Sequence, residues 1–189
     1  MAMTTVAATT DIPASGDVFV RSLSPNTTHD ADLISIRKFA GEQRYGVIQF
    51  DLAALVGQTV IGVELILDEL GSGNAGNDAN YPLVSAAYMI GSSSDLPDVS
   101  SMTWNSYQAT YEGQESAVFA TLGAYNLPAN GTSRASQSTF GNAADRALIQ
   151  SVVDQSGNNV LTLVLKAVND NNAHGFGDNE YYGDDPILR

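Results

Sequence analysis

The chain has 189 residues, of which 21 are Asp or Glu and 8 are Lys or Arg, so its formal net charge at pH 7 is −13. This net charge argues against nucleic-acid binding, which depends on clustered Lys and Arg, and no run of ~18 apolar residues is present that would span a membrane. The absence of cysteine excludes thiolate catalysis and cysteine-ligated zinc.

The first segment of the chain, residues 1–16, is small and polar, and we expect a linker or leader there, followed by one domain over 17–189. In that domain, β-branched and aromatic residues alternate with polar ones and are bounded by Gly, Pro and Asn turn signals. These patterns predict strands over residues 17–23, 33–39, 44–52, 59–70, 83–90, 115–122 and 160–168. By the two-residue period of a strand, Phe50 lies on a core face, as do Ile61, Val63, Leu65 and Leu67.

One helix is predicted, over residues 142–155. Asn142 is its expected N-cap, Gly157 follows its end, and Leu148, Ile149, Val152 and Val153 form its apolar stripe. Many short strands with one short helix predict an all-β fold, namely an antiparallel β-sandwich of the jelly-roll type.

Catalytic signatures are absent from the sequence. It contains no glycine-rich phosphate loop, no GxSxG nucleophile turn and no HExxH zinc motif. The two histidines, His29 and His174, lie in different segments, and we expect structural roles for both. A jelly-roll lyase that uses His174 with Tyr181 stays open as an alternative.

Oxygen-rich side chains gather among glycines between residues 170 and 180. Carboxylate and amide oxygens are the ligands that Ca²⁺ prefers, so we predict a structural calcium ion; turn formation by the same residues is the alternative. The predicted ligands are Asp170, Asn172, Asp178 and Glu180. Further donors are available at Asp184, Asp185 and in residues 73–78.

Three aromatic residues, Trp104, Tyr107 and Tyr111, lie close together in the sequence. Exposed aromatic rings stack on the C–H faces of sugars, so these residues are candidates for a saccharide platform. The alternative is that Trp104 anchors a long loop to the core, because a single tryptophan is commonly buried.

Arginine is scarce, and half of the arginines fall in the first three predicted strands. If these strands are neighbours, their basic residues gather on one face together with a tyrosine. The candidate ligand-binding residues are Arg21, Arg37, Arg44 and Tyr45. Such a face either binds an acidic polysaccharide or forms a salt-bridge set with Asp17 and Asp32.

The order of these patterns resembles a known family. It includes Asp17-Val-Phe-Val-Arg21, the Arg44-to-Leu52 strand, Met102-Thr-Trp-Asn105 and a closing Gly177-Asp-Asn-Glu180. This order is similar to the DNRLRE-domain group of carbohydrate-binding modules, some of which bind alginate. The resemblance covers roughly 17–189 and implies a β-sandwich attached to a secreted bacterial or archaeal polysaccharide-active or surface protein.

We therefore expect a non-catalytic carbohydrate-binding module that tethers a secreted parent protein to a polysaccharide, such as a uronate polymer. As one module of a larger protein it is expected to be monomeric, with no nucleic-acid or membrane partner. The alternatives are a structural or adhesive cell-surface module without sugar affinity and, third, a jelly-roll polysaccharide lyase or hydrolase.

Overall fold

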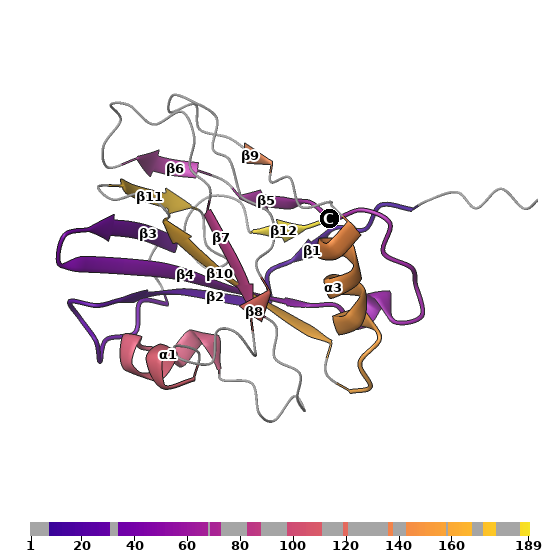
Figure 1. Cartoon of the computed structure of the whole chain (residues 1–189), viewed down its shortest axis with the longest axis horizontal. Coiled ribbons are helices and arrows are strands. Elements are labelled where there is room, and N and C mark those ends of the chain that lie inside the picture. The colour runs from indigo at the N-terminus through magenta and orange to yellow at the C-terminus, as the bar shows by residue number, and fades with distance from the viewer. Residues whose placement is uncertain are drawn as a thin grey trace, which may run out of the picture.

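The computed structural model describes residues 8–30, 34–67, 69–72, 83–87, 98–110, 119–120, 136–137, 143–157, 159–167, 172–176 and 186–189. Most of the regular structure in these residues is β-strand, and the paired strands of both sheets run antiparallel (Figure 1). The prediction of an all-β chain with few helices is confirmed at this level.

The smaller sheet, called sheet A here, has the strand order β1-β12-β5-β9. Its strands are β1 (Ile12–Pro13), β12 (Ile187–Leu188), β5 (Leu65–Leu67) and β9 (Ser136–Gln137). The larger sheet, sheet B, has the order β6-β11-β3-β4-β10-β7-β8, and β2 pairs with β4 outside this path. Its strands are β2 (Gly16–Arg21), β3 (Ile34–Phe39), β4 (Glu42–Asp51), β6 (Glu69–Ser72), β7 (Leu83–Ala87), β8 (Phe119–Ala120), β10 (Val160–Ala167) and β11 (Asn172–Phe176).

Most predicted strands have a counterpart in the structure. The segments 17–23, 33–39, 44–52 and 160–168 correspond to β2, β3, β4 and β10, with small shifts at their ends. The predicted strands 83–90 and 115–122 contain β7 and β8, and their remaining residues lie outside the described part of the chain. The alternation of β-branched and polar residues therefore located the strands that build the centre of sheet B.

The prediction of one strand over residues 59–70 is wrong. Residues 59–64 form no regular strand, and the chain then contributes β5 to sheet A and β6 to sheet B. Ile61, which was expected to be a core residue, is 62% exposed, whereas Val63 is buried. The physical reason is that the pairing of β5 with β12 ends at the two backbone hydrogen bonds between Glu64 and Arg189. Residues 61–63 therefore have no backbone hydrogen bond to a partner strand among the described residues.

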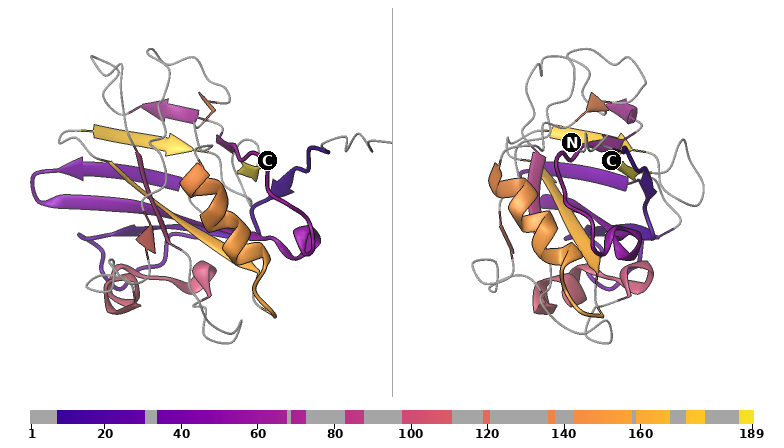
Figure 2. Two further views of the ribbon diagram at one scale, coloured as in Figure 1. Left: turned by 45° about the vertical axis from the view of Figure 1, so that its right-hand side comes forward. Right: turned by 90° about the vertical axis from the view of Figure 1, so that its right-hand side faces the viewer.

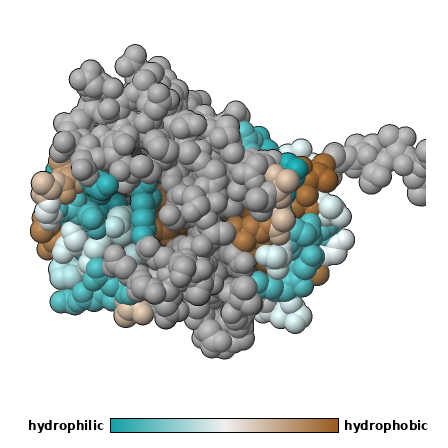
Figure 3. Space-filling model, viewed as in Figure 1, coloured by the Kyte–Doolittle hydropathy of each residue, from teal (hydrophilic) through white to brown (hydrophobic). Residues whose placement is uncertain are grey.

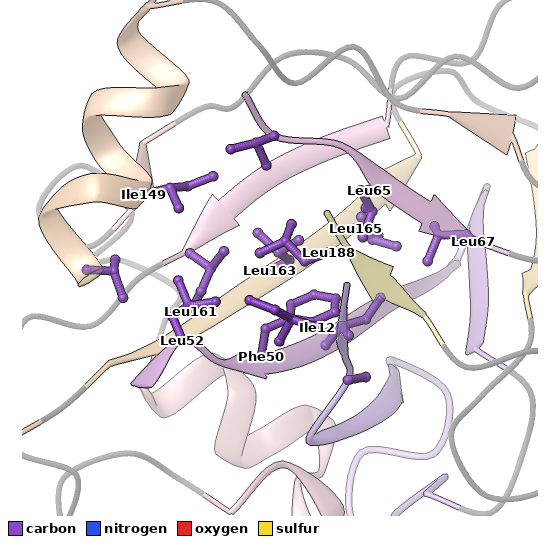
Figure 4. Packing of buried hydrophobic residues seen from close by; sticks show 14 of the residues in the cluster. Ile12, Phe50, Leu52, Leu65, Leu67, Ile149, Leu161, Leu163, Leu165 and Leu188 are labelled. Atoms are coloured by element: carbon purple, nitrogen blue, oxygen red, sulfur yellow. The ribbon is translucent and has the colours of Figure 1, made fainter. Parts of the chain in front are cut away.

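The main core joins both sheets to helix α3 (Ala143–Val153), which confirms the helix predicted over 142–155. Figure 4 shows Ile12 and Leu188 of sheet A close to Phe50 of sheet B, with Ile149 of α3 directed toward the same interior. Phe50 and Leu163 are fully buried, as expected. The apolar stripe of α3 is likewise confirmed by the burial of Ile149, Val152 and Val153 and the partial burial of Leu148. In Figures 1 and 2, α3 lies on the side of β10 that sheet A also covers.

A second core lies on the opposite face of sheet B. Val47 of β4 and Val164 of β10 point to this face, because they alternate with residues of the main core. Val18 and Val20 of β2 point the same way, because they pair with Val47 and Tyr45 of β4. The segment that covers this face contains the 3-10 helix η3 (Val99–Ser101) and helix α1 (Trp104–Thr110). The described residues thus contain two α-helices where one was expected.

Helix α1 begins with reciprocal hydrogen bonds between two hydroxyl residues. The Ser106 N–H donates to the Thr103 hydroxyl at 3.2 Å, and the Thr103 N–H donates to the Ser106 hydroxyl at 2.9 Å. This is the arrangement of a capping box, with serine in the place of the usual Glu or Gln. Within the described residues, neither α-helix has the length and apolar composition needed to cross a membrane.

Candidate functional site

Three arginines lie side by side on three neighbouring strands of sheet B. In the strand register, Arg44 of β4 is opposite Arg21 of β2 on one side and opposite Arg37 of β3 on the other. Directly opposed residues in antiparallel strands point to the same face of a sheet. The expectation that these arginines gather is therefore confirmed, and we call Arg21, Arg37, Arg44 and the adjoining Glu42 the arginine face.

Tyr45 does not belong to the arginine face, and the expectation that it does is wrong. It follows Arg44 in β4, so it points to the opposite side of the sheet, where it is part of the second core. Its hydroxyl donates a hydrogen bond to Gln43 Oε1 at 2.7 Å.

All three guanidinium groups contact one carboxylate, that of Glu42. Arg21 Nε lies 2.6 Å and Arg44 Nη2 lies 2.9 Å from Glu42 Oε1, and Arg37 Nη1 lies 3.1 Å from Oε2. The Glu42 side chain is only 10% exposed. Glu42 is thus a carboxylate shared by all three arginines; Asp32, one of the predicted partners, lies outside the described residues.

The arginines keep the Glu42 carboxyl ionised. Burial raises its pKa, but hydrogen bonds and charge attraction from Arg44 and Arg21 act in the other direction, and the net pKa lies below the usual value. At neutral pH the arginine face therefore carries three positive charges against one negative charge. Guanidinium groups donate hydrogen bonds and stay protonated, so this arrangement suits the binding of an anion rather than proton transfer.

Arg37 is the most exposed of the three arginines, at 32%. Its Nη1 contacts Glu42, and its buried Nε has no hydrogen-bond partner among the described residues. Its guanidinium carbon lies 4.1 Å from the centroid of the Phe39 ring, which holds the side chain against the sheet. Arg21 and Arg44 use their Nε groups on Glu42, and Arg44 Nη1 also donates to the Ser35 hydroxyl at 3.1 Å.

Phe19 packs beside Arg44 and connects the arginine face to the segment that contains His29. The Arg44 guanidinium carbon lies 5.7 Å from the Phe19 ring centroid, and the His29 ring stacks on Phe19 with centroids 4.3 Å apart. Residue 29 also forms an isolated β-bridge with residue 19. These contacts give His29 a structural position against β2.

Two of the three aromatic residues expected to form a saccharide platform are buried. Trp104 is 6% exposed and Tyr107 is fully buried; with Tyr45 they form a cluster whose ring centroids lie 5.1 to 6.3 Å apart. Lys166 Nζ lies 4.5 Å from the Tyr45 ring centroid. Trp104 and Tyr107 thus anchor the segment of α1 to the core, which was the alternative role, and Tyr111 lies outside the described residues.

No family model matches this chain. Nor does any curated protein match it. The assignment of a function therefore rests on the residues and their geometry.

The proposed calcium ligands fall mostly outside the described residues. Asp170, Asp178 and Glu180 are not described, and Asn172 is the first residue of β11. In the described part of the chain, no three His, Asp or Glu side chains come together as a metal site would require. The calcium prediction thus stays a prediction.

Glu42 was not singled out from the sequence, although a signal for it is present. Gly41, with φ of +87°, forms the turn of the β3–β4 hairpin, and such a left-handed conformation favours glycine. A turn at this position places Glu42 opposite Phe39 and Arg44 opposite Arg37. Because Glu42 and Arg44 are two residues apart, they share a face, so the hairpin pattern alone predicts the contact.

Proposed function

We propose that the protein is a non-catalytic binding module whose arginine face binds the carboxylates of an acidic polysaccharide, such as the uronate polymer alginate. The observation that carries this proposal is the arginine face itself. Three arginines on adjacent strands share one carboxylate and remain 20–32% exposed, although the whole chain has a net charge of −13. A local positive surface on so acidic a protein favours an anionic ligand.

The arrangement in a row favours a polymer over a single small anion. Neighbouring strands lie about 4.8 Å apart, so the backbones of Arg21, Arg44 and Arg37 lie at successive steps across the sheet, while their guanidinium groups converge on Glu42. Guanidinium–carboxylate contacts are charge-assisted and often bidentate, so we propose that the N–H groups not used on Glu42 bind carboxylates of the ligand. A polyuronate offers carboxylates at regular intervals along its length.

The burial of Trp104 and Tyr107 supports an anionic rather than a neutral ligand. A neutral glycan would need exposed aromatic rings for stacking, and these two rings face the second core. An adhesive or structural module without sugar affinity is the second candidate, because an ion cluster around Glu42 also stabilises a sheet without any ligand.

The wider proposal follows the family resemblance. We propose a secreted, monomeric module that raises the local concentration of its parent protein on a polysaccharide, with a structural calcium ion at Asp170, Asn172, Asp178 and Glu180. We also propose that the two sheets are the layers of a jelly-roll β-sandwich of the DNRLRE-domain group. The main core supports this, because residues of both sheets meet in it.

Affinity electrophoresis in gels that contain either alginate or a neutral glucan tests the function. We expect retardation by alginate only, and Arg37→Gln should reduce it strongly. Arg189→Gln is the matched control, because Arg189 pairs with Asp11 next to sheet A, away from the arginine face. Retardation should weaken as salt shortens the Debye length from about 10 Å at 0.1 M to about 3 Å at 1 M.

Three results would contradict the proposal. Equal retardation by the neutral glucan would point to recognition without charge. No retardation in a broad set of polysaccharides would favour the adhesive module, and release of unsaturated sugar products would identify a lyase.

A further inference from the structure

The contacts that Glu42 makes with the three arginines are unequal. Glu42 Oε1 accepts hydrogen bonds from the Nε groups of Arg21 and Arg44, at 2.6 and 2.9 Å, and it also lies 2.9 Å from Arg44 Nη2. Glu42 Oε2 lies 3.1 Å from Arg37 Nη1, which is its one charged contact among the described residues. Arg21 and Arg44 therefore hold the carboxylate through its first oxygen, whereas Arg37 is attached to it through one longer contact.

The electrostatics of Glu42 show the same inequality. Burial raises the pKa of its carboxyl, and the hydrogen bonds and charges that bring this pKa below its ordinary value come from Arg44 and Arg21. Arg37 is 32% exposed, so water screens part of its attraction to Glu42. If Arg37 withdrew, Glu42 would therefore stay ionised and would still be held by two arginines.

The position of Arg37 does not depend on Glu42 alone. Its guanidinium carbon lies 4.1 Å from the centroid of the Phe39 ring, and this cation–π contact needs no carboxylate. Its buried Nε has no hydrogen-bond partner among the described residues, and a buried donor without a partner disfavours the arrangement in which it occurs. A movement of the guanidinium over the Phe39 ring, away from Glu42, would keep the first contact and expose Nε to water or a ligand.

The end of the molecule that carries these residues suits a polar ligand. The β3–β4 hairpin lies at the left in Figure 1, and Figure 3, seen from the same side, shows hydrophilic residues, in teal, at that end. Strands β2, β4 and β3 are neighbours in sheet B, so a chain that crosses them passes all three arginines. A polysaccharide, which is polar along its whole length, fits such a surface.

Glu42 competes with every carboxylate that a ligand brings to the arginine face. It is two residues from Arg44 and lies opposite Phe39 across the hairpin, so it is tethered beside the arginines. A tethered group has an effective concentration in the millimolar range even when its tether is flexible. A single dissolved uronate would replace one carboxylate by another of equal charge and gain little. A polymer that already contacts Arg21 holds its next carboxylate near Arg37, so it competes as a tethered group too.

We propose that Glu42 is a specificity-determining residue: a carboxylate of a uronate polymer displaces Glu42 from Arg37, while the other two arginines keep Glu42 in place. This inference rests on the proposed function and adds to it the requirement for a polymer. Glu42 excludes uronate monosaccharides and other small monocarboxylates, because they cannot compete with a tethered carboxylate.

The first experiment is calorimetric titration of Glu42→Gln with an oligouronate prepared from alginate and with glucuronate as the monomer. The parent should bind the oligomer and not the monomer. We expect Glu42→Gln to bind the oligomer about fivefold more tightly, which corresponds to removing one partly exposed ion pair of about 1 kcal/mol, and to bind the monomer measurably. Glu64→Gln is the matched control: it removes the same charge beside Arg189, away from the arginine face, and should bind as the parent does.

The outcomes separate this inference from the proposed function. Equal or weaker binding of the oligomer by Glu42→Gln, together with loss of binding in Arg37→Gln, would overturn the inference alone, because Glu42 would then position the arginines and not compete for them. Absence of binding by the parent and by Glu42→Gln alike, with both shown to be folded by circular dichroism, would overturn the inference and the proposed function together.

A second experiment needs no variant, so it does not depend on the stability of Glu42→Gln. The side-chain carboxyl carbon of Glu42 is followed by NMR in the parent protein during titration with the same oligouronate at neutral pH. We expect its resonance to shift in step with the guanidinium resonances of Arg37, while the Glu64 carboxyl stays unchanged. A shift of Arg37 with no change at the Glu42 carboxyl would show binding without exchange and would overturn the inference.

Discussion

Replacing Glu42 with glutamine tests the electrostatic account of the arginine face. The substitution keeps the shape of the side chain and removes the only carboxylate that the described residues place against Arg21, Arg37 and Arg44. Removing one partner of a buried ion pair costs about 3–5 kcal/mol. Since the three arginines are 20–32% exposed, water solvates part of each charge, and we expect a smaller loss, about 2–3 kcal/mol.

The pH dependence of this loss follows from the direction of the pKa shift. The pKa of Glu42 is lower in the folded protein than in the unfolded chain, so its stabilisation is complete above the ordinary carboxyl pKa, about 4.3. It is lost as the pH falls through the folded-state pKa. The stabilities of the parent and of Glu42→Gln should therefore differ at pH 7 and converge in acid.

The assay is urea unfolding at pH 7 and at a series of lower pH values, with equal m-values as the condition for comparison. Glu64→Gln is the matched control: Glu64 has one long contact, 3.8 Å from Arg189, and its replacement should change the stability by less than about 0.5 kcal/mol. A Glu42→Gln protein within about 0.5 kcal/mol of the parent at pH 7, or a difference that persists in acid, would refute the reasoning.

Four further outcomes follow from the described residues. Leu163→Ala should lower the free energy of unfolding by about 2–5 kcal/mol, because Leu163 is fully buried in the main core; a loss under about 0.5 kcal/mol in urea unfolding would contradict this. Gly46→Ala should cost about 1–3 kcal/mol, because its Cβ would lie 2.6 Å from Ile34 Cγ2, whereas Gly62→Ala, in open space, should be neutral. Trp104 fluorescence should shift to the red on unfolding, because its ring is buried, and an emission already typical of water in the folded protein would contradict its place in the second core. EDTA should lower the melting temperature and calcium should restore it if Asp170, Asp178 and Glu180 hold an ion; an unchanged melting curve would remove the calcium proposal.

The centre of the fold was predictable because its strands obey local rules. β3, β4 and β10 have apolar residues at alternate positions and α3 has an apolar stripe, and these residues are buried in the main core. β2 buries Val18 and Val20 in the second core. Segment 59–70 also alternates, yet whether an alternating segment becomes a strand depends on its neighbours. Residues 61–63 have the pattern of a strand but lie where the described chain supplies no partner. Periodicity does not contain that information.

The arginine face was predictable in part. The alternation of side chains along each strand predicted that Arg21 and Arg37 share one face of the sheet if their strands are neighbours. The hairpin turn at Gly41 places Arg37 opposite Arg44. Glu42 was missed as the counter-ion because the predicted salt-bridge set used Asp17 and Asp32, which precede Arg21 and Arg37, and did not include the acid that follows the hairpin turn. The aromatic residues were ambiguous for a different reason: the sequence shows that Trp104 and Tyr107 lie three residues apart, but their burial depends on the pairing of β2 with β4, which forms the surface that α1 covers.

The most direct test of the central claim is to observe the arginine side chains during titration with an oligouronate. The Nε–H resonances of an arginine respond when its guanidinium binds a carboxylate. We expect a saturable shift at Arg37, the most exposed of the three arginines at 32%, with smaller shifts at Arg21 and Arg44 and none at Arg189. Shifts at Arg189 alone, or none at any arginine while the polymer still binds, would contradict the assignment of the arginine face as the binding site.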